Sequence, residues 1–191
     1  MVERTARPQL NGRHPVHLTM RVLPGIPSLR VLNAWVRRAL IAGSSRAGFR
    51  LIHFSILSNH LHLIAEADDA RALSRGMQGL AVRIARAVNQ ALSRKHGKVF
   101  SDRYHEHVLT TPAETRAAIR YLIHNFRKHM AQAGRPVAAD FIDPHSSAVY
   151  FAGLEKNPLP TARFWFLTRG WSLAGPIDVG RIRVAPGSAP V

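Results

Sequence analysis

The sequence predicts an α+β fold in which helices cover a mostly antiparallel sheet. Runs rich in β-forming residues alternate with segments whose apolar residues recur every three or four positions. Their order along the chain is strand, helix, strand, strand, helix, strand, helix. At 191 residues with 46% hydrophobic residues, the chain is long enough for one domain with a sizeable core.

The first strand and the first helix are marked by turn and cap residues. "HPVHLTMRVL" (14–23) is rich in β-formers and is followed by Pro24 and Gly25, which predicts a strand closed by a turn. Residues 28–44 carry apolar side chains at helical spacing, with Ser28 as a candidate N-cap. A strand followed by a helix is therefore expected.

A hairpin and a long helix come next. The strand-like runs 49–57 and 60–66 are separated only by Ser58 and Asn59, a length that suits a tight hairpin. Residues 70–95 place apolar side chains three and four apart, with arginines elsewhere on the cylinder. This pattern predicts an amphipathic helix with one face on the sheet.

A fourth strand and a capped helix complete the predicted core. Residues 98–110 alternate like a strand. Thr111, Pro112 and Glu114 then combine an N-cap, a proline at the first helical position and a glutamate placed to close a capping box. The helix is expected to run from Pro112 to about Met130.

The C-terminal part has a different composition. We expect a domain over 1–155 and an irregular basic extension over 156–191, which contains five prolines and several glycines. Its aromatic cluster "RFWFLTRGW" (163–171) is expected to pack back on the domain. The alternative is that Trp165 or Trp171 stacks on nucleic-acid bases.

The charge balance points to a polyanionic partner. The chain has 27 Lys and Arg against 11 Asp and Glu, a net charge of +16 and a pI near 11.7. Nucleic acid is the first candidate. An arginine-heavy composition can also reflect a GC-rich genome. A membrane surface is disfavoured, because the basic residues are spread along the chain instead of lining one amphipathic helix.

Cysteine is absent, which removes disulfides, thiolate nucleophiles and sulfur-based zinc sites. Any metal must be held by histidine, carboxylate, amide or water. The N-terminus lacks the apolar core of a signal peptide, and no apolar run is long enough to span a bilayer. We therefore expect a soluble, cytoplasmic protein.

Two histidines in the predicted hairpin suggest a metal site. Residues two apart on a strand share a face, so His60 and His62 lie side by side with Glu66 further along. Two neutral imidazoles can bind one divalent ion, with Asn59, Glu66 or a neighbouring element supplying oxygen. In a chain with 11 histidines such a pair also arises by chance, as "HEH" (105–107) shows.

A tyrosine and an amide occupy one face of the helix that starts at Pro112. Tyr121 and Asn125 are one helical turn apart, and Arg116, Arg120 and Arg127 flank them. A phenol can attack a phosphodiester when a metal polarises the phosphate and cations hold the backbone. The alternative is an ordinary core tyrosine.

Four segments resemble a known family. "FSILSNHLHLIAE" (54–66), "VFSDRYHEHVLTTPAE" (99–114), "RYLIHNFRKHMAQAG" (120–134) and "DPHSSAVYF" (143–151) are similar, in order and spacing, to motifs of the REP-associated tyrosine transposases, the single-tyrosine branch of the HUH endonucleases. The resemblance covers roughly residues 12–152. Four matched segments are more specific than any one of them.

The resemblance implies a site and a reaction. It identifies His60 and His62 as the HUH histidines, Tyr121 as the nucleophile and Asn125 as the residue that completes a Mg2+ or Mn2+ site. It implies a ferredoxin-like or RRM-like sandwich whose relatives cut and rejoin single-stranded DNA near hairpins, through a 5′-phosphotyrosine linkage. The partner is then single-stranded or hairpin DNA, bound by a monomer or homodimer.

Basic side chains are the expected DNA contacts. By their charge and position we expect five residues to contact the DNA backbone: His17, Arg103, Arg116, Arg120 and Arg127.

Departures from the family pattern leave alternatives open. The family's Asn-Pro-Val-Arg is here Asn-Phe-Arg-Lys at 125–128, and its Met-Pro is Leu-Ser at 57–58. Neither change removes a reactive group, but both allow a catalytically inactive, domesticated DNA-binding or regulatory protein. Tyr104 is a rival nucleophile beside histidines. An RNA-binding RRM-like module is less favoured, because no strand carries paired base-stacking aromatics.

Overall fold

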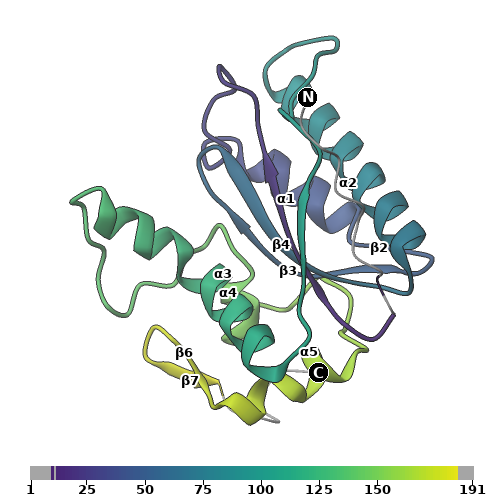
Figure 1. Ribbon diagram of the computed structural model, residues 1–191. Helices are drawn as coiled ribbons and strands as arrows, with labels where there is room; N and C mark the ends of the chain where they lie inside the picture. The colour runs from purple at the N-terminus through teal and green to yellow at the C-terminus, as the bar shows by residue number, and fades with distance from the viewer. Residues whose placement is uncertain (1–9, 11, 185–191) are drawn as a thin grey trace, which may run out of the picture.

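A five-stranded antiparallel sheet organises the chain in the computed structural model, which describes residues 10 and 12–184. The strand order is β2-β3-β4-β1-β5, with β1 between β4 and β5 (Figure 1). The strands are β1 (Val16–Arg21), β2 (Ser45–Arg46), β3 (Phe49–Ile56), β4 (His60–Ala67) and β5 (His105–Val108). Leaving out the two-residue β2, this is the strand order of the ferredoxin-like sandwich, and the α+β prediction is confirmed.

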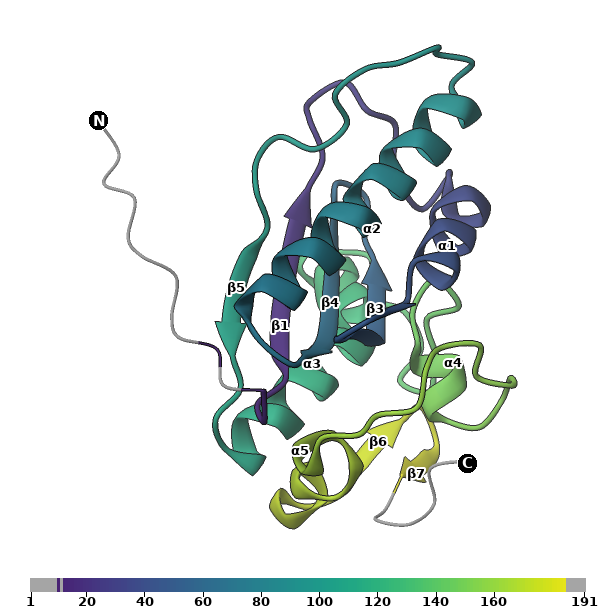
Figure 2. The same ribbon diagram turned by 90° about the vertical axis from the view of Figure 1, so that its right-hand side faces the viewer.

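Helices cover both faces of this sheet. α1 (Asn33–Ala42) and α2 (Ala70–Ala91) pack on one face, and α3 (Pro112–Gln132) packs on the other, as Figure 2 shows. Alternation along the strands separates two apolar clusters: Leu18 and Leu63 face α1 and α2, whereas Ile64 faces α3. The sheet therefore lies between a layer formed by α1 and α2 and a layer formed by α3.

Local sequence signals explain where the two long helices begin. Asp69 caps α2 by accepting a hydrogen bond from the amide of Ala72. At α3, the hydroxyl of Thr111 accepts from the amide of Glu114, and the carboxylate of Glu114 accepts from the amide of Thr111. The predicted capping box is confirmed, and it fixes the start of the helix that carries Tyr121.

The first helix begins later than its periodicity suggested. α1 starts at Asn33 behind Leu32, which provides no side-chain cap. Ser28 is not the N-cap, because its hydroxyl accepts from the amide of Arg30 and its carbonyl accepts from Val31 and Leu32 in a preceding turn. Leu29 and Leu32 of that turn still pack in the core, which is why they extend the helical pattern.

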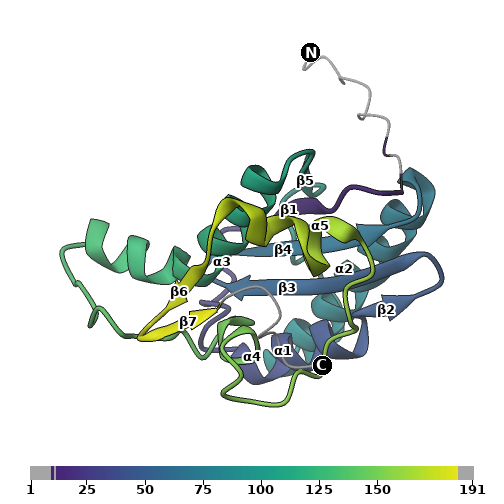
Figure 3. The same ribbon diagram turned by 90° about the horizontal axis from the view of Figure 1, so that it is seen from below.

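The C-terminal segment contains regular structure where an irregular extension was expected. After α4 (Ala148–Phe151) it forms α5 (Trp165–Thr168), the 3-10 helix η1 (Gly170–Ala174) and the hairpin β6 (Ile177–Val179) and β7 (Ile182–Val184). These elements lie beside α3 (Figure 3). Trp171 is buried there, as expected for the aromatic cluster, whereas Trp165 is 49% exposed.

A buried carboxylate ties this segment to the sheet. Glu66 on β4 is fully buried, accepts from Nε of Arg50 at 2.9 Å, and accepts from the backbone amides of Arg163 and Phe164. Every one of these contacts is charge-assisted. The extension is therefore anchored to the edge of the core.

Among the described residues, no helix has the length and hydropathy needed to cross a membrane.

Candidate active site

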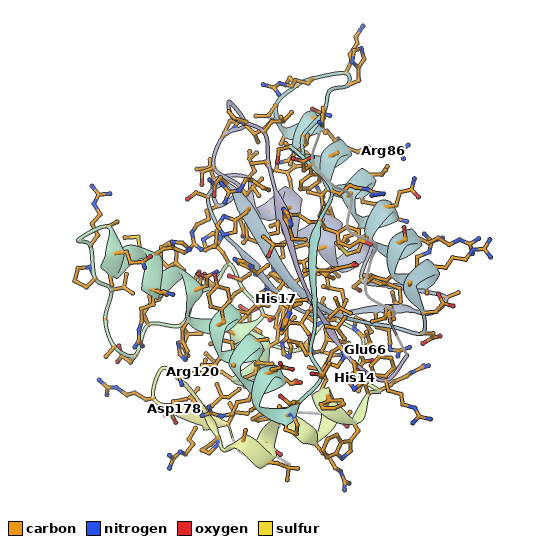
Figure 4. All side chains as sticks on the ribbon, in the orientation of Figure 1. His14, His17, Glu66, Arg86, Arg120 and Asp178 are labelled. Atoms are coloured by element: carbon orange, nitrogen blue, oxygen red, sulfur yellow. The ribbon has the colours of Figure 1, made fainter. Side chains whose placement is uncertain are left out.

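The site lies on the sheet face that α3 covers, where neighbouring strands bring polar side chains together. Thr19 on β1 is paired with His62 on β4, and His17 is paired with Ile64. Paired residues share a face, so His17, Thr19, His60 and His62 all face the α3 side. Figure 4 shows His17 near the middle of the molecule.

His62 is held by two neighbours on β1. Its Nδ1 lies 3.1 Å from Oγ1 of Thr19 and 3.2 Å from Nε2 of His17. With the proton on Nδ1, His62 donates toward these acceptors and keeps its lone pair on Nε2. That tautomer suits a metal ligand, whose second nitrogen is commonly fixed by a hydrogen bond.

His60 is oriented in the same way by its predecessor. Its Nδ1 lies 2.7 Å from Oδ1 of Asn59, an acceptor, so Nδ1 carries the proton and Nε2 keeps the lone pair. The rings of His60 and His62 stand 4.8 Å apart between centroids and nearly perpendicular, at 87°. Asn59, considered above as an oxygen ligand, instead orients the histidine.

The electrostatic environment keeps these imidazoles neutral. Burial lowers the pKa of His62 to about 3, and the neighbouring His17 and His60 lower it in the same direction. Burial, followed by His129 and Arg21, lowers the pKa of His60 to about 4. Burial also lowers the pKa of His17 to about 4, with a contribution from His107. Neutral imidazole is the form that binds a metal.

Tyr121 on α3 reaches over this histidine pair. Its hydroxyl lies 3.5 Å from Nε2 of His62, and its ring stands edge-on to His62 at 5.1 Å and to His17 at 5.9 Å. The side chain is 37% exposed, which is inconsistent with an ordinary core tyrosine. The structure therefore brings together the predicted nucleophile and one of the predicted metal ligands.

Asn125 lies one turn further along α3 and is 1% exposed. Neither its amide nitrogen nor its carbonyl oxygen has a hydrogen-bond partner among the described residues. A buried, unpaired carboxamide is unusual, because it costs roughly 1–3 kcal/mol of desolvation. The unpaired Oδ1 of Asn125 is an oxygen that could bind a cation.

The side chains of His60, His62 and Asn125 are suitable ligands for a divalent ion. His60 and His62 offer lone pairs on Nε2, and Asn125 offers an unpaired oxygen. Glu66 does not belong to the set, since both of its oxygens are taken by Arg50 and by backbone amides. Within the described part of the chain, no group of three or more His, Cys, Asp or Glu side chains forms a metal centre.

A groove of about 1050 Å³ adjoins the tyrosine and runs between α3 and the β6–β7 hairpin. Tyr121 and Asn125 line it, together with four basic residues of α3: Arg116, Arg120, Arg127 and Lys128. Figure 4 labels Arg120 on α3 and Asp178 on β6, on its two sides. The groove is positively charged and open to the nucleophile.

The basic residues expected to contact DNA are not equivalent. Arg120 is exposed in the groove, and Arg103 is exposed in the loop before β5. Arg116 donates to the carbonyls of Gly175 and Pro176, and Arg127 donates to the carbonyl of Ala139. Arg116 and Arg127 thus hold the walls of the groove in place while keeping their charge.

Three neighbours were not identified from the sequence. Thr19 bonds to His62, Nζ of Lys128 stands 5.9 Å from the ring centre of Tyr121, and His129 stands 5.9 Å from His60 between ring centroids. His17, expected as a phosphate contact, instead faces His62 and Tyr121. Strand alternation places Thr19 on the face of His17, but only the pairing of β1 with β4 brings both to His62.

One comparison with known proteins supports the fold. No protein-family model matches the sequence, and no curated protein matches it either. A solved REP-associated tyrosine transposase bound to a REP hairpin superimposes with a TM-score of 0.59 and 15% identity, covering 94% of this chain and 98% of that one.

A crystal structure described as a transposase from Deinococcus radiodurans R1 aligns with a TM-score of 0.38 and 19% identity, over 72% of this chain and 99% of that one. The first comparison carries the conclusion, since it spans nearly the whole of both chains. This chain has the fold of a REP-associated tyrosine transposase.

Proposed function

We propose that this protein is a metal-dependent single-stranded DNA endonuclease and transposase that acts through a covalent tyrosine linkage at hairpin-forming sequences. The observation that carries the proposal is the position of the Tyr121 hydroxyl, 3.5 Å from Nε2 of His62 and on the same helix as the unpaired amide of Asn125. The solved transposase of the same fold, bound to a REP hairpin, supports the choice of DNA.

The proposed chemistry is a transfer of the phosphoryl group from DNA to Tyr121. The phenolic oxygen forms a bond to phosphorus, the bond from phosphorus to the 3′ oxygen breaks, and the tyrosine proton passes to water. The 3′ oxygen takes a proton and leaves as a hydroxyl, so the DNA stays attached through a 5′-phosphotyrosine. A later attack by a 3′ hydroxyl reverses the step, and no nucleotide cofactor is needed.

The surrounding residues bind and orient the reactants. His60, His62 and Asn125 would hold Mg2+ or Mn2+, which supplies polarisation of the scissile phosphate. Arg120 and Lys128 place positive charge along the groove that leads to Tyr121, where the backbone of one strand would lie. Thr19 and His17 hold the ring of His62 in its orientation through Nδ1.

Formation of a covalent protein–DNA adduct tests this proposal. Purified protein is incubated with labelled single-stranded hairpin DNA from the flanks of its own gene, with Mn2+ or with EDTA, and analysed in SDS. We expect an adduct that requires the metal and is lost in Tyr121→Phe, which keeps the ring and removes only the nucleophilic oxygen.

The alternative function predicts the opposite result. A catalytically inactive DNA-binding or regulatory protein would bind the hairpin equally with and without metal, and equally in Tyr121→Phe. If the protein binds the hairpin but forms no adduct with any flank sequence, the endonuclease proposal gives way to that of a domesticated DNA-binding protein.

A further inference from the structure

A second basic surface lies on the opposite side of the molecule from Tyr121. Four arginines of α2 are exposed: Arg71, Arg75, Arg83 and Arg86. At 100° per residue they fall within about one third of the helix circumference, on the side away from the sheet. Figure 4 shows Arg86 extending outward from α2. We call these residues, together with Arg46, the α2 surface.

Arg46 joins the row from a different element. It ends β2, and its Nη1 donates to the backbone carbonyl of Arg75 at 2.9 Å. The same Nη1 lies 3.1 Å from where a Cβ on Gly79 would stand, so the absence of a side chain there lets the guanidinium lie against the helix. A backbone carbonyl does not neutralise Arg46, so its charge adds to that of α2.

No acidic residue balances this charge along the sequence. Between residues 70 and 101 the chain contains no Asp or Glu, although its basic residues include Arg94, Lys95 and Lys98 after the helix. In residues 10 and 12–184, the ion pairs fall on other arginines: Arg30, Arg37, Arg50, Arg181 and Arg183. In the sequence, the flanking carboxylates are Asp68 and Asp69 before the helix, where Asp69 is the cap, and Asp102 after it.

Like charges one turn apart destabilise a helix, so this row has a cost within the protein alone. The apolar face of α2 packs on the sheet and keeps the helix folded without help from its charges. The outward arginines are therefore dispensable for folding. A polyanionic partner would turn the repulsion into a gain.

The chemistry of the α2 surface favours the backbone of a duplex over a single strand. Arg71 and Arg86 are about 22 Å apart along the helix, which matches about six to seven base pairs of duplex. Proteins that hold single strands stack bases on aromatic side chains, and α2 has no aromatic residue. Its exposed uncharged residues are Ala70, Gln78, Val82 and Gln90.

We propose that the α2 surface binds the phosphate backbone of double-stranded DNA, independently of sequence. The sheet separates it from Tyr121, so the duplex held there is not the strand under attack. The inference rests on the proposed function only in taking DNA as the partner. It adds a second contact region that holds duplex DNA while the other face processes a single strand.

The test measures the salt dependence of duplex binding. A labelled blunt duplex of unrelated sequence is titrated with the full chain in EDTA between 50 and 300 mM KCl, conditions that need neither metal nor Tyr121. The variant is Arg75→Gln with Arg86→Gln. The control, Arg181→Gln with Arg183→Gln, removes the same charge from exposed arginines that are already paired with Asp140 and Asp178.

We expect the α2 variant to make the slope of log K against log salt shallower by about 2, because each lost phosphate contact contributes about 0.9. Affinity near physiological salt should fall by about tenfold or more, with a much smaller change in the control. An unchanged slope in the α2 variant, or equal losses in both variants, would overturn the proposal. Loss of binding to anionic lipid vesicles but not to duplex would also overturn it.

Cleavage provides a separate readout. With a short single-stranded oligonucleotide that cannot form a stem, the α2 variant should form the tyrosine adduct at the rate of the unaltered chain. A slower adduct in the α2 variant would contradict the separation of the two faces. If no chain forms an adduct on this stemless oligonucleotide, the hairpin substrate described above decides the endonuclease proposal, and the duplex titration decides the α2 surface.

Discussion

At the scale of single residues, the site contains two histidines oriented by hydrogen bonds and one buried asparagine that forms none with its side chain. Asn59 and Thr19 occupy Nδ1 of His60 and His62, and this leaves both Nε2 atoms available. The buried amide of Asn125 has neither of its atoms paired among the described residues. A buried polar group without a hydrogen bond destabilises the fold. Such groups are typical of functional sites, where a bound ligand supplies the partner.

Asn125→Leu should therefore stabilise the protein and abolish adduct formation. Leucine has a similar volume and removes two unpaired polar atoms, so the free energy of unfolding should rise by about 1–2 kcal/mol. Urea unfolding measures it. The control is Asn89→Leu, since Asn89 is also buried and its Oδ1 is unpaired, but its Nδ2 donates to the carbonyl of Gly97. Asn89→Leu should be destabilised. If Asn125→Leu is destabilised as well, the interpretation of Asn125 as a metal ligand is contradicted.

Thr19→Val should weaken the affinity for Mn2+ by about tenfold while leaving the fold intact, since valine keeps the shape and removes the hydroxyl that orients His62. The dependence of adduct rate on Mn2+ concentration, with direct Mn2+ titration, measures this. Ser55→Ala is the matched control: Ser55 flanks His62 on the other strand, and its hydroxyl has no partner among the described residues. An equal loss of Mn2+ affinity in Thr19→Val and Ser55→Ala would contradict a positioning role for Thr19.

At the scale of elements, the site depends on where α3 and the C-terminal segment are fixed. The capping box starts α3 at Pro112, which places Tyr121 and Asn125 on one face over β1 and β4. Arg116 and Glu66 then attach the C-terminal segment to α3 and to β4. The groove beside Tyr121 therefore exists only when that segment is docked.

Glu66→Gln should loosen this docking. The change leaves Arg50 buried without a counter-charge and weakens the bonds to the amides of Arg163 and Phe164, so unfolding free energy should fall by about 3–5 kcal/mol. Glu155→Gln provides the control, because its pair with Arg37 is exposed and should contribute less than about 1 kcal/mol. Similar urea midpoints for the two variants would show that Glu66 does not anchor the segment.

The sequence predicted the elements better than their contacts. The capping box at Thr111 and the hairpin around Asn59 depend on neighbouring residues, so local patterns were enough to identify them. The contact of His17 with His62 joins residues 45 positions apart and depends on strand register, which no local pattern fixes. The short elements after residue 164 escaped prediction because they are stabilised by packing on α3, not by their own periodicity.

At the scale of the whole molecule, a sheet separates two basic surfaces, and the interior keeps its histidines neutral. Burial lowers the pKa of His53 to about 4, and its Nδ1 lies 3.2 Å from the hydroxyl of Ser147. The unfolded chain binds a proton at this residue near pH 6.5, whereas the folded chain does so only near pH 4. Stability contributed by neutral His53 is therefore complete above pH 6.5 and is lost as the pH falls toward 4.

The free energy of unfolding of the natural chain, relative to that of His53→Gln, should decrease as the pH falls from 6.5 toward 4. A shift of this size corresponds to about 3–4 kcal/mol when complete. Urea unfolding of both proteins between pH 4 and pH 7.5 measures it. A difference that stays constant with pH would show that His53 titrates alike in the folded and unfolded chains.

The central claim is that Tyr121 becomes covalently linked to DNA. The chain has three tyrosines, and trypsin separates Tyr121 in 121–127 from Tyr104 and Tyr150. The most direct measurement is mass spectrometry of the peptides from a Mn2+-dependent adduct after nuclease digestion. The account predicts a nucleotide on the phenol of peptide 121–127, and the same mass on the peptide that carries Tyr104 would contradict it.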